Sequence, residues 1–222
     1  SEKSLAVMDL LISADERVKA GDFIFSEDKT SFTAAHSLLR LILSRQVNIP
    51  PLSLKFVTNR YGKPELCISS LSDEFQLNAK PLVNFNLSHI KNMVAVAISN
   101  NPCGVDLCSL TDEIPTNSLT SGEIRSIKSI DKKKQSMHFA AIWSIKEAYL
   151  KATGKGLNVQ PENIEVKIND ENIEVYNFGI PETRFLYGLW NFDSVTLGVA
   201  VYENTEIKII KFDDFDELMS SF

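Results

Sequence analysis

Two long stretches of helical periodicity, each followed by a run of strand-like segments, most constrain what this chain can fold into. Residues 31–47 carry apolar side chains at a period of about 3.6 until Ile-Pro-Pro at 49–51 stops the pattern. Residues 135–153 form a second such stretch, which Gly154 ends. The segments expected as strands are 52–57, 82–89, 93–99 and 103–110, and then 163–168, 173–178, 184–190, 195–202 and 207–211.

This order of a helix and then strands, met twice, predicts an α+β fold made of two pseudo-duplicated halves. We expect each half to pack one long helix on a small antiparallel sheet, with residues 1–110 in the first half and 111–222 in the second. The halves are expected to form one compact unit. The repeat is architectural, because the two halves show no convincing residue-level similarity.

Shorter signals predict the smaller elements. A weak alternation over residues 5–12 predicts a first strand. Ser13 and Thr120 are each followed by a glutamate three residues later, which is the capping-box pattern of a helix start. Three apolar strands follow one another between residues 82 and 110, and we expect them to form one antiparallel sheet. Within it, Gly104 allows another backbone to approach closely.

Composition narrows the class of protein. The chain has 222 residues and a formal net charge of −6, which argues against nucleic acid as the main partner. A basic stretch at 128–134 is either a local binding patch or a solvated loop or helix end. The three cysteines form no short paired spacing, so neither a disulfide framework nor a zinc cage is expected. Without a signal peptide or a long apolar run, we expect a reduced, cytoplasmic protein away from membranes.

Two acidic residues are candidates for chemistry. Asp106 lies inside an apolar strand, and Glu147 lies on the second long helix, four residues before Lys151. One carboxylate from a strand and one from a helix could converge on a hard cation such as Mg²⁺. The alternative is that both are ordinary acids, with Asp106 held by backbone amides and Glu147 paired with Lys151 across one helical turn.

Polar residues close one of the expected strands. A period of two places Asn86 and Ser88 on one face, with His89 on the other face or at the strand end. Such groups suit phosphate oxygens, and the alternative is a structural hydrogen bond. No G-x-S-x-G elbow surrounds Ser88, and neither a Walker A loop nor G-x-G-x-x-G occurs. The Tyr-Gly-Lys-Pro turn at 61–64 can approach a flat base or a phosphate.

Taken in order, four motifs are far more specific than any one of them. They are R-Y-G-K-P (60–64), F-N-L-S-H (85–89), G-V-D-L (104–107) and W-S-I-K-E-A-Y-L-K-A-T-G-K-G-L (143–157). Over most of its length the chain resembles the 4'-phosphopantetheinyl transferases of the large, surfactin-synthetase-activating type. The resemblance implies transfer of the 4'-phosphopantetheine arm of coenzyme A (CoA) to a carrier-protein serine, releasing 3',5'-ADP. It also implies a pseudo-dimer with CoA and Mg²⁺ in the cleft between the halves.

The resemblance also assigns roles by position. Asp106 and Glu147 match the metal-binding acids, and Glu147 is the implied general base. Lys151 matches a residue beside the transferring phosphate, which is both catalytic and CoA-binding. The other implied CoA-binding residues are Arg17, Lys19, His36, Lys63, Pro64, Ser88 and His89, of which Lys63 and Pro64 form the turn that meets the adenine nucleotide. Glu123 matches a further acid near the active site, and Trp143 matches a packing position.

Two departures from the family pattern stand out. Cys108 occupies the position where many members have a third acidic ligand, and sulfur suits hard Mg²⁺ poorly. We therefore expect water to fill that place, metal affinity to fall, or Mn²⁺ to compete better. Asp22, Ser31 and His36 stand where members often have arginine, so the basic cluster for the CoA 3'-phosphate is thinned. These departures keep one alternative open: a non-catalytic homologue that binds CoA or a carrier protein without transfer.

The expected partner is an acyl or peptidyl carrier protein, whose acidic helix needs a basic or apolar patch on this chain. Residues 125–134, just before the second long helix, are the candidate patch. Because an internal pseudo-dimer builds its own cleft, we expect a monomer. The sequence does not indicate which carrier protein or pathway is served.

Overall fold

The structure is a computed structural model, and it describes residues 2–67, 83–155, 159–169, 172–203 and 205–220. Its helices are α1 (Glu2–Leu11), α2 (Ala14–Gly21), α3 (Ser26–Val47), α5 (Ser121–Ser129), α6 (Lys132–Thr153) and α7 (Phe215–Ser220), with 3-10 turns η1 (Pro51–Ser53) and η4 (Pro161–Asn163). Its strands are β1 (Phe56–Thr58), β2 (Pro64–Leu66), β3 (Asn84–Ile90), β4 (Met93–Ser99), β5 (Cys103–Ser109), β6 (Ile164–Ile168), β7 (Ile173–Asn177), β8 (Ile180–Pro181), β9 (Phe185–Phe192) and β10 (Val195–Tyr202).

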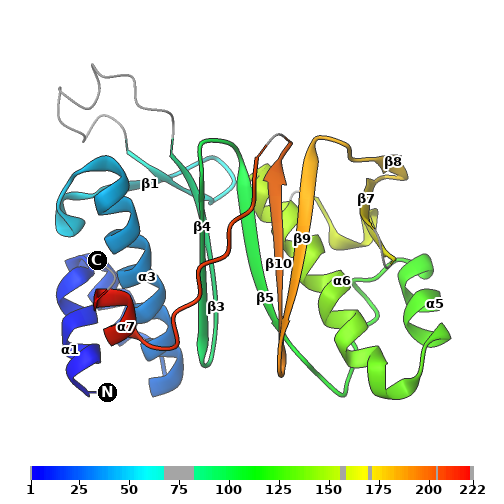
Figure 1. Cartoon of the computed structure of the whole chain (residues 1–222), viewed down its shortest axis with the longest axis horizontal. Coiled ribbons are helices and arrows are strands. Elements are labelled where there is room, and N and C mark those ends of the chain that lie inside the picture. Colours follow the sequence, from blue (N-terminus) through cyan, green and yellow to red (C-terminus); the bar gives the residue numbers. More distant parts are fainter. Residues whose placement is uncertain (1, 68–82, 156–158, 170–171, 204, 221–222) are drawn as a thin grey trace.

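The elements form layers across the molecule. From left to right, Figure 1 shows the helices α1 and α3, the hairpin β3–β4, the sheet β5–β10–β9, and then α6 with α5. Helix α3 packs on β3 and β4, and helix α6 packs on β5 and β10. The predicted α+β architecture, in which each half has a long helix on a small antiparallel sheet, is confirmed.

Among the residues that the structure describes, three apolar cores hold these layers together. In the first half, Leu39 and Leu43 of α3 pack with Phe85 of β3. In the second, the apolar face of α6 packs with β6, β7, β9 and β10. A central core joins the halves: the β4 face that carries Met93, Ala95 and Ala97 packs against apolar side chains of β5 and β10. Burial of these faces is the main stabilising contribution, at about 25 cal/mol per Å² of apolar surface.

Two glycines bring the helix α6 unusually close to its sheet. A Cβ on Gly104 of β5 would lie 2.0 Å from the Ala148 carbonyl oxygen of α6, and one on Gly198 of β10 would lie 2.4 Å from the Ser144 carbonyl carbon. Side-chain carbons do not approach backbone atoms so closely, so only glycine fits at either position. The predicted close approach at Gly104 is therefore confirmed, and it sets the position of the helix that carries Glu147.

The predicted pairing of β5 is wrong. β3 and β4 form a two-stranded sheet, whereas β5 pairs antiparallel with β10, with Val105 opposite Val199. The apolar pattern of β5 indicates that both of its faces are buried, which the central core and α6 provide, but it does not select the strand that pairs along its edge. The division after residue 110 stays a prediction, but this pairing places β5 in the sheet of the second half.

Side chains rather than a backbone ladder join β3 to β5. The Val105 amide donates to Asn86 Oδ1 at 2.9 Å, and the Leu107 amide donates to Ser88 Oγ at 3.1 Å. Both side chains lie on the face of β3 that the period of two predicts, and both are buried. They satisfy amides of β5 that would otherwise be orphaned in the interior.

The helices predicted after Ser13 and Thr120 and over residues 31–47 and 135–153 are confirmed. Ser13 and Thr120 each form a complete capping box, at the starts of α2 and α5. The long helices begin several residues earlier than predicted, and Gly154 ends α6 in the left-handed conformation, with φ of 65°. None of the helices in the described ranges combines the length and apolarity needed to cross a bilayer.

Three predicted strands are wrong in whole or in part. Residues 5–12 lie mainly in α1, where the Met8 carbonyl accepts a hydrogen bond from Ser37 of α3. Residues 52–57 divide between η1 and the start of β1. Residues 207–211 form no strand; instead this segment crosses from β10 to the first half, where α7 lies beside α1 (Figure 1). There Ser4 donates to Asp216 at 3.2 Å.

Candidate functional site

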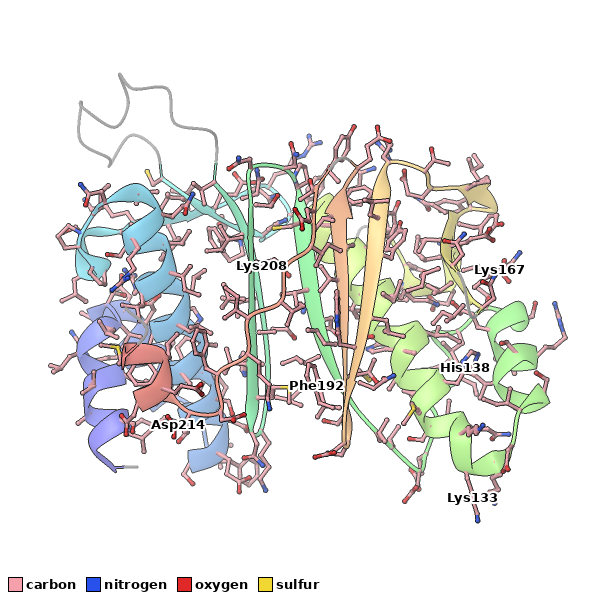
Figure 2. All side chains as sticks on the ribbon, viewed as in Figure 1. Lys133, His138, Lys167, Phe192, Lys208 and Asp214 are labelled. Atoms are coloured by element: carbon pink, nitrogen blue, oxygen red, sulfur yellow. The ribbon has the colours of Figure 1, made fainter. Side chains whose placement is uncertain are left out.

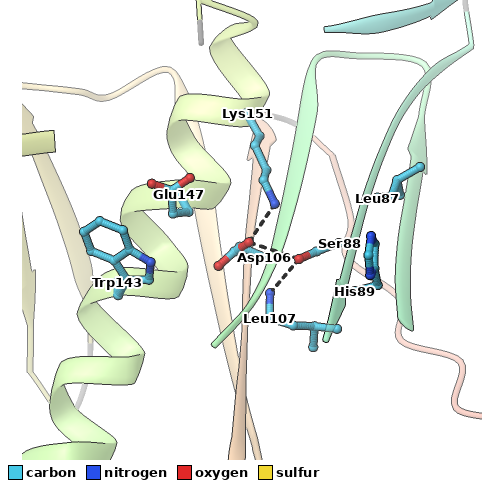
Figure 3. A pocket seen from close by; sticks show the side chains of 8 residues that line it. All are labelled: Leu87, Ser88, His89, Asp106, Leu107, Trp143, Glu147 and Lys151. Carbon is cyan, nitrogen blue, oxygen red and sulfur yellow. Dashed lines mark hydrogen bonds and ion pairs between the residues drawn. The ribbon is translucent and has the colours of Figure 1, made fainter. Parts of the chain in front are cut away.

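A pocket of about 540 Å³ lies where β3, β5 and α6 meet. Its lining residues are Leu87, Ser88 and His89 of β3, Asp106 and Leu107 of β5, and Trp143, Glu147 and Lys151 of α6. Figure 3 shows these three groups converging from their separate elements. Three of the four sequence motifs, those at 85–89, 104–107 and 143–157, therefore contribute residues to one pocket. Trp143 also stacks on Phe139, with ring centroids 6.2 Å apart, so it combines the predicted packing position with a place in the pocket wall.

Asp106 is the hydrogen-bonding centre of the pocket. Lys151 Nζ donates to Asp106 Oδ1 at 2.6 Å, and Ser88 Oγ donates to the same oxygen at 3.0 Å (Figure 3). Lys151 Nζ also reaches the Val105 carbonyl at 3.2 Å. Burial raises the pKa of Asp106, and the charge and hydrogen bond of Lys151 oppose that rise. Asp106 is thus a buried carboxylate that depends on a nearby cation.

Glu147 faces the pocket one helical turn before Lys151. Among the described residues its carboxylate has no hydrogen-bond or ion-pair partner, because Lys151 turns to Asp106 instead. The alternative of an ordinary Glu147–Lys151 pair is therefore not what the structure shows. Burial and the negative charge of Asp106 raise the pKa of Glu147. A raised carboxyl pKa without a structural partner is typical of a group that acts on a ligand.

The donor set fits a hard divalent cation. Asp106 and Glu147 repel each other electrostatically. The Lys151 ammonium forms an ion pair with Asp106 Oδ1, which compensates part of this negative charge. Across the described ranges there is no group of three or more carboxylate, imidazole or thiol ligands. Burial and the two acids raise the pKa of Cys108 to about 12, so its thiol stays protonated near neutral pH. Two carboxylates, completed by water and substrate oxygens, match the way Mg²⁺ is usually held.

Ser88 and His89 lie in the pocket on opposite faces of β3. The Ser88 hydroxyl is already occupied, since it donates to Asp106 and accepts from the Leu107 amide. His89 faces α3, where its ring lies 6.5 Å from Phe32. Burial and the positive charges of His36 and Lys151 lower the pKa of His89. A neutral imidazole at this position can offer a hydrogen bond to a phosphate, rather than a full charge.

The Arg60–Pro64 motif lies away from the pocket lining. Lys63 Nζ points into the protein, where it donates to the Lys151 carbonyl at 2.8 Å and to the Cys103 carbonyl at 3.2 Å. Pro64 is exposed at the start of β2. The role implied for this turn, contact with the adenine nucleotide, stays a prediction. In the fourth motif, Gly156 and Leu157 lie outside the described residues.

The predicted CoA-binding cations of the first half are largely occupied by the protein itself. Arg17 donates to the carbonyls of Asp9 and Ile12 at 2.8 and 2.9 Å. His36 Nδ1 lies 2.9 Å from Glu16 Oε1, and its ring stacks on Phe32 at 4.1 Å. Lys19 is exposed in the last turn of α2. The place of Arg17, Lys19 and His36 in CoA binding stays a prediction.

Sequence reasoning recognised Glu16 only as a capping residue. It also accepts from Arg40 Nε at 2.7 Å, and Arg40 is buried. Burial alone would raise the pKa of Glu16, but hydrogen bonds from His36, Arg40 and the Ser13 amide lower it to about 2. Glu16 therefore stays ionised and orients His36. This contact joins α2 to α3, and no sequence pattern within either helix predicts it.

Glu123 lies outside the pocket lining, in a buried ion pair of its own. Its Oε2 accepts from Lys146 Nζ at 2.7 Å, both side chains are fully buried, and its Oε1 accepts from the Val166 amide at 2.8 Å. Lys146 also donates to the Ser118 carbonyl at 3.2 Å. These contacts tie α5, α6 and β6 together, so the observed role of Glu123 is structural.

Comparisons with known proteins identify the family of this chain. The family model described as 4'-phosphopantetheinyl transferase, N-terminal, matches residues 1–101, and that of the 4'-phosphopantetheinyl transferase superfamily matches residues 102–200. Their boundary falls between β4 and β5. HetI of Nostoc, a 4'-phosphopantetheinyl transferase, is 33% identical over 176 residues, which cover 75% of this chain and 69% of that protein. Sfp of Bacillus subtilis, also a 4'-phosphopantetheinyl transferase, is 29% identical over 163 residues, covering 72% and 68%.

Among solved structures, a holo-(acyl-carrier-protein) synthase from Bacillus anthracis in complex with CoA overlaps 47% of this chain and 96% of its own. Its TM-score is 0.39 and its sequence identity 22%, values too low to place any residue of the site. The sequence similarities and the two family models are sufficient by themselves: this chain belongs to the 4'-phosphopantetheinyl transferase superfamily.

Proposed function

We propose that the chain transfers the 4'-phosphopantetheine arm of CoA to a serine hydroxyl of an acyl or peptidyl carrier protein. The observation that carries this function is the pocket between the two halves, where Asp106, Glu147 and Lys151 converge in a member of this superfamily. In the reaction, the serine oxygen forms a bond to the phosphorus of the arm. The bond from that phosphorus to the bridging pyrophosphate oxygen breaks, and 3',5'-ADP leaves.

Asp106 and Glu147 are the residues that would hold a divalent cation, with Mg²⁺ favoured and Mn²⁺ possible. When bound there, the cation would neutralise negative charge on the pyrophosphate oxygens. Lys151 Nζ lies 2.6 Å from Asp106 Oδ1, so a bound cation would replace the ammonium at this oxygen and leave Lys151 to contact the substrate. Many family members have a third acidic metal ligand at the position of Cys108. Because the Cys108 thiol is protonated, we propose that water takes the place of this ligand.

The protein side chains divide the remaining work. Glu147, whose carboxylate has no partner among the described residues, accepts the proton of the carrier serine directly or through one water. Lys151 supplies positive charge, or a proton, to the oxygen that leaves with 3',5'-ADP. Ser88 orients Asp106 through its hydrogen bond at 3.0 Å, and His89 donates to a phosphate oxygen from the other face of β3.

A basic surface next to the catalytic helix is the proposed carrier-protein site. It comprises Arg125 and Lys128 of α5 and Lys132, Lys133 and Lys134 of α6. Figure 2 shows Lys133 at the tip where the two helices meet, with its side chain directed away from the ribbon. An acidic helix of a carrier protein complements this patch despite the net charge of −6 on the whole chain. We propose a monomer, because both halves of the pocket come from one chain. We propose the cytoplasm as its location, as expected from the sequence.

Mass spectrometry of an apo-carrier protein tests the function directly. Apo-carrier, CoA and Mg²⁺ are incubated with the protein, and the expected result is a gain equal to one phosphopantetheine arm on the carrier serine. Acyl and peptidyl carriers are tested in parallel, since the sequence does not select between them. CoA binding without any mass gain on several carriers would contradict transfer and favour the non-catalytic homologue.

The CoA 3'-phosphate is expected to contribute modestly to catalysis. Arg17 and His36 are engaged by groups of the protein, so neither is a free cation for that phosphate. We expect kcat/KM for dephospho-CoA to fall less than about tenfold below that for CoA, because an exposed charge pair is worth at most about 1 kcal/mol, which is less than a factor of ten. Steady-state kinetics with both substrates measures the ratio. A loss of a hundredfold or more would contradict this prediction.

A further inference from the structure

We infer that Lys63 is a positioning residue, through which the first half fixes the two elements that carry the reacting side chains. Its ammonium donates to the backbone carbonyls of Lys151 and Cys103, at 2.8 and 3.2 Å. Lys151 is the residue whose side chain pairs with Asp106. Cys103 begins β5, the strand that carries Asp106. A single side chain of the first half thus connects the end of α6 to the start of β5.

The turn that carries Lys63 is itself docked on the end of α6. Asn59 Oδ1 accepts from the amides of Tyr61 and Lys63 at 2.8 and 3.1 Å, which closes the turn. Asn59 Nδ2 then donates to the Gly154 carbonyl at 3.2 Å. A Cβ on Gly154 would lie 3.3 Å from both Asn59 Nδ2 and the Lys63 side chain. The turn is therefore packed against the C-cap of the catalytic helix, as well as hydrogen-bonded to it.

The end of a helix is a favourable place for this ammonium. The last carbonyls of a helix lack partners of the regular helical pattern, and they carry the negative end of the helix dipole. The Lys151 carbonyl accepts from the Gly154 cap amide at 3.2 Å, and Lys63 of the first half is its second donor, at 2.8 Å. Burial lowers the pKa of Lys63, which is the desolvation cost of holding the ammonium inside. The neighbouring Cys103 thiol stays neutral, because burial raises its pKa to about 11.

The consequence concerns catalysis rather than nucleotide affinity, and it rests on the proposed transferase function. If Lys63 sets the distance between Lys151 and Asp106, its loss lowers kcat while the KM for CoA changes little. If instead Lys63 contacts the nucleotide, as the family resemblance implies, its loss raises the KM and the dissociation constant of CoA. The two roles are therefore separated by the parameter that changes.

The test compares Lys63→Met, Lys63→Arg and Lys55→Met with the wild type in the carrier assay. Methionine keeps the length of the side chain but removes its donors, and arginine restores donors. Lys55 is an exposed lysine of the same segment and serves as the matched control. We expect kcat for Lys63→Met to fall tenfold or more, because small misplacements of catalytic groups cost up to about a hundredfold. The KM for CoA should change less than threefold, and Lys63→Arg should recover most of kcat.

Hydrogen exchange gives a second readout that needs no activity. Amides near residues 150–154 and 103–106 should exchange faster in Lys63→Met than in Lys55→Met, whether or not transfer is observed. Lys63→Gln replaces the methionine variant if that variant does not fold. An unchanged kcat with unchanged exchange overturns the inference, as does a tenfold rise in KM at constant kcat. Absence of transfer by the wild type would instead count against the proposed function alone.

Discussion

Replacing Glu147 by glutamine is expected to lower the transfer rate about a thousandfold while leaving the fold in place. Glutamine keeps the shape of the side chain but cannot accept the serine proton, and positioned general bases contribute about 10²–10⁴-fold to a rate. It also removes one of the two carboxylates that would hold the cation. The loss should appear in kcat measured with saturating CoA and carrier protein.

The same substitution should not destabilise the protein, which separates a catalytic role from a structural one. Glu147 has no hydrogen-bond or ion-pair partner in the described ranges, and its charge disfavours that of Asp106. Removing this repulsion leaves the thermal midpoint unchanged or higher. Glu113→Gln, at an exposed glutamate, is the control and should transfer at the wild-type rate. A Glu147→Gln enzyme within tenfold of wild type would contradict the assignment of the base.

Gly104→Ala is expected to cost roughly 3 kcal/mol of unfolding free energy, and to lower transfer as well. The new Cβ would lie 2.0 Å from the Ala148 carbonyl oxygen and 2.5 Å from the Ala152 amide nitrogen. Both are backbone atoms of α6, so no side-chain rotation relieves the contact, and the helix must move away from β5. That movement separates Glu147 and Lys151 from Asp106.

Denaturant unfolding measures this cost, and Gly21→Ala is the matched control. A Cβ on Gly21 meets no atom within 4 Å, and its position at the end of α2 makes alanine acceptable. Stability of that variant should change by less than about 0.5 kcal/mol. If Gly104→Ala were as stable and active as Gly21→Ala, the close packing of α6 on β5 would not be required.

Local sequence patterns predicted the elements whose signals lie within a few residues. The period of α3 and α6, the capping boxes at Ser13 and Thr120, and the glycine at 154 each act through neighbours in the chain. They identified the helix that carries Glu147 and the strand that carries Asp106. The close backbone approach predicted at Gly104 was also confirmed, because a glycine between buried strand residues usually marks a bulge, a bend or such an approach.

What could not be predicted depends on contacts between distant segments. Residues 5–11 lie in a helix that packs on α3, and weak alternation over eight residues cannot indicate such a distant contact. Lys151 forms its ion pair with Asp106 rather than with Glu147 because of the position of β5, and the spacing along α6 does not indicate this. The inward direction of Lys63 depends in the same way on carbonyls that belong to the other half.

The pairing of β5 with β10 also has a consequence for how the chain is made. On the ribosome, β3 and β4 can join as soon as both have emerged, since only a short turn separates them. β5 is synthesised directly after β4, but it cannot pair until β10 (Val195–Tyr202), the last strand of the described chain, has emerged. Such long-range pairings close slowly and leave an apolar strand exposed meanwhile. A nascent chain whose synthesis stops within α6 therefore exposes the unpaired edge of β5. Chaperone binding or aggregation at this edge would compete with folding.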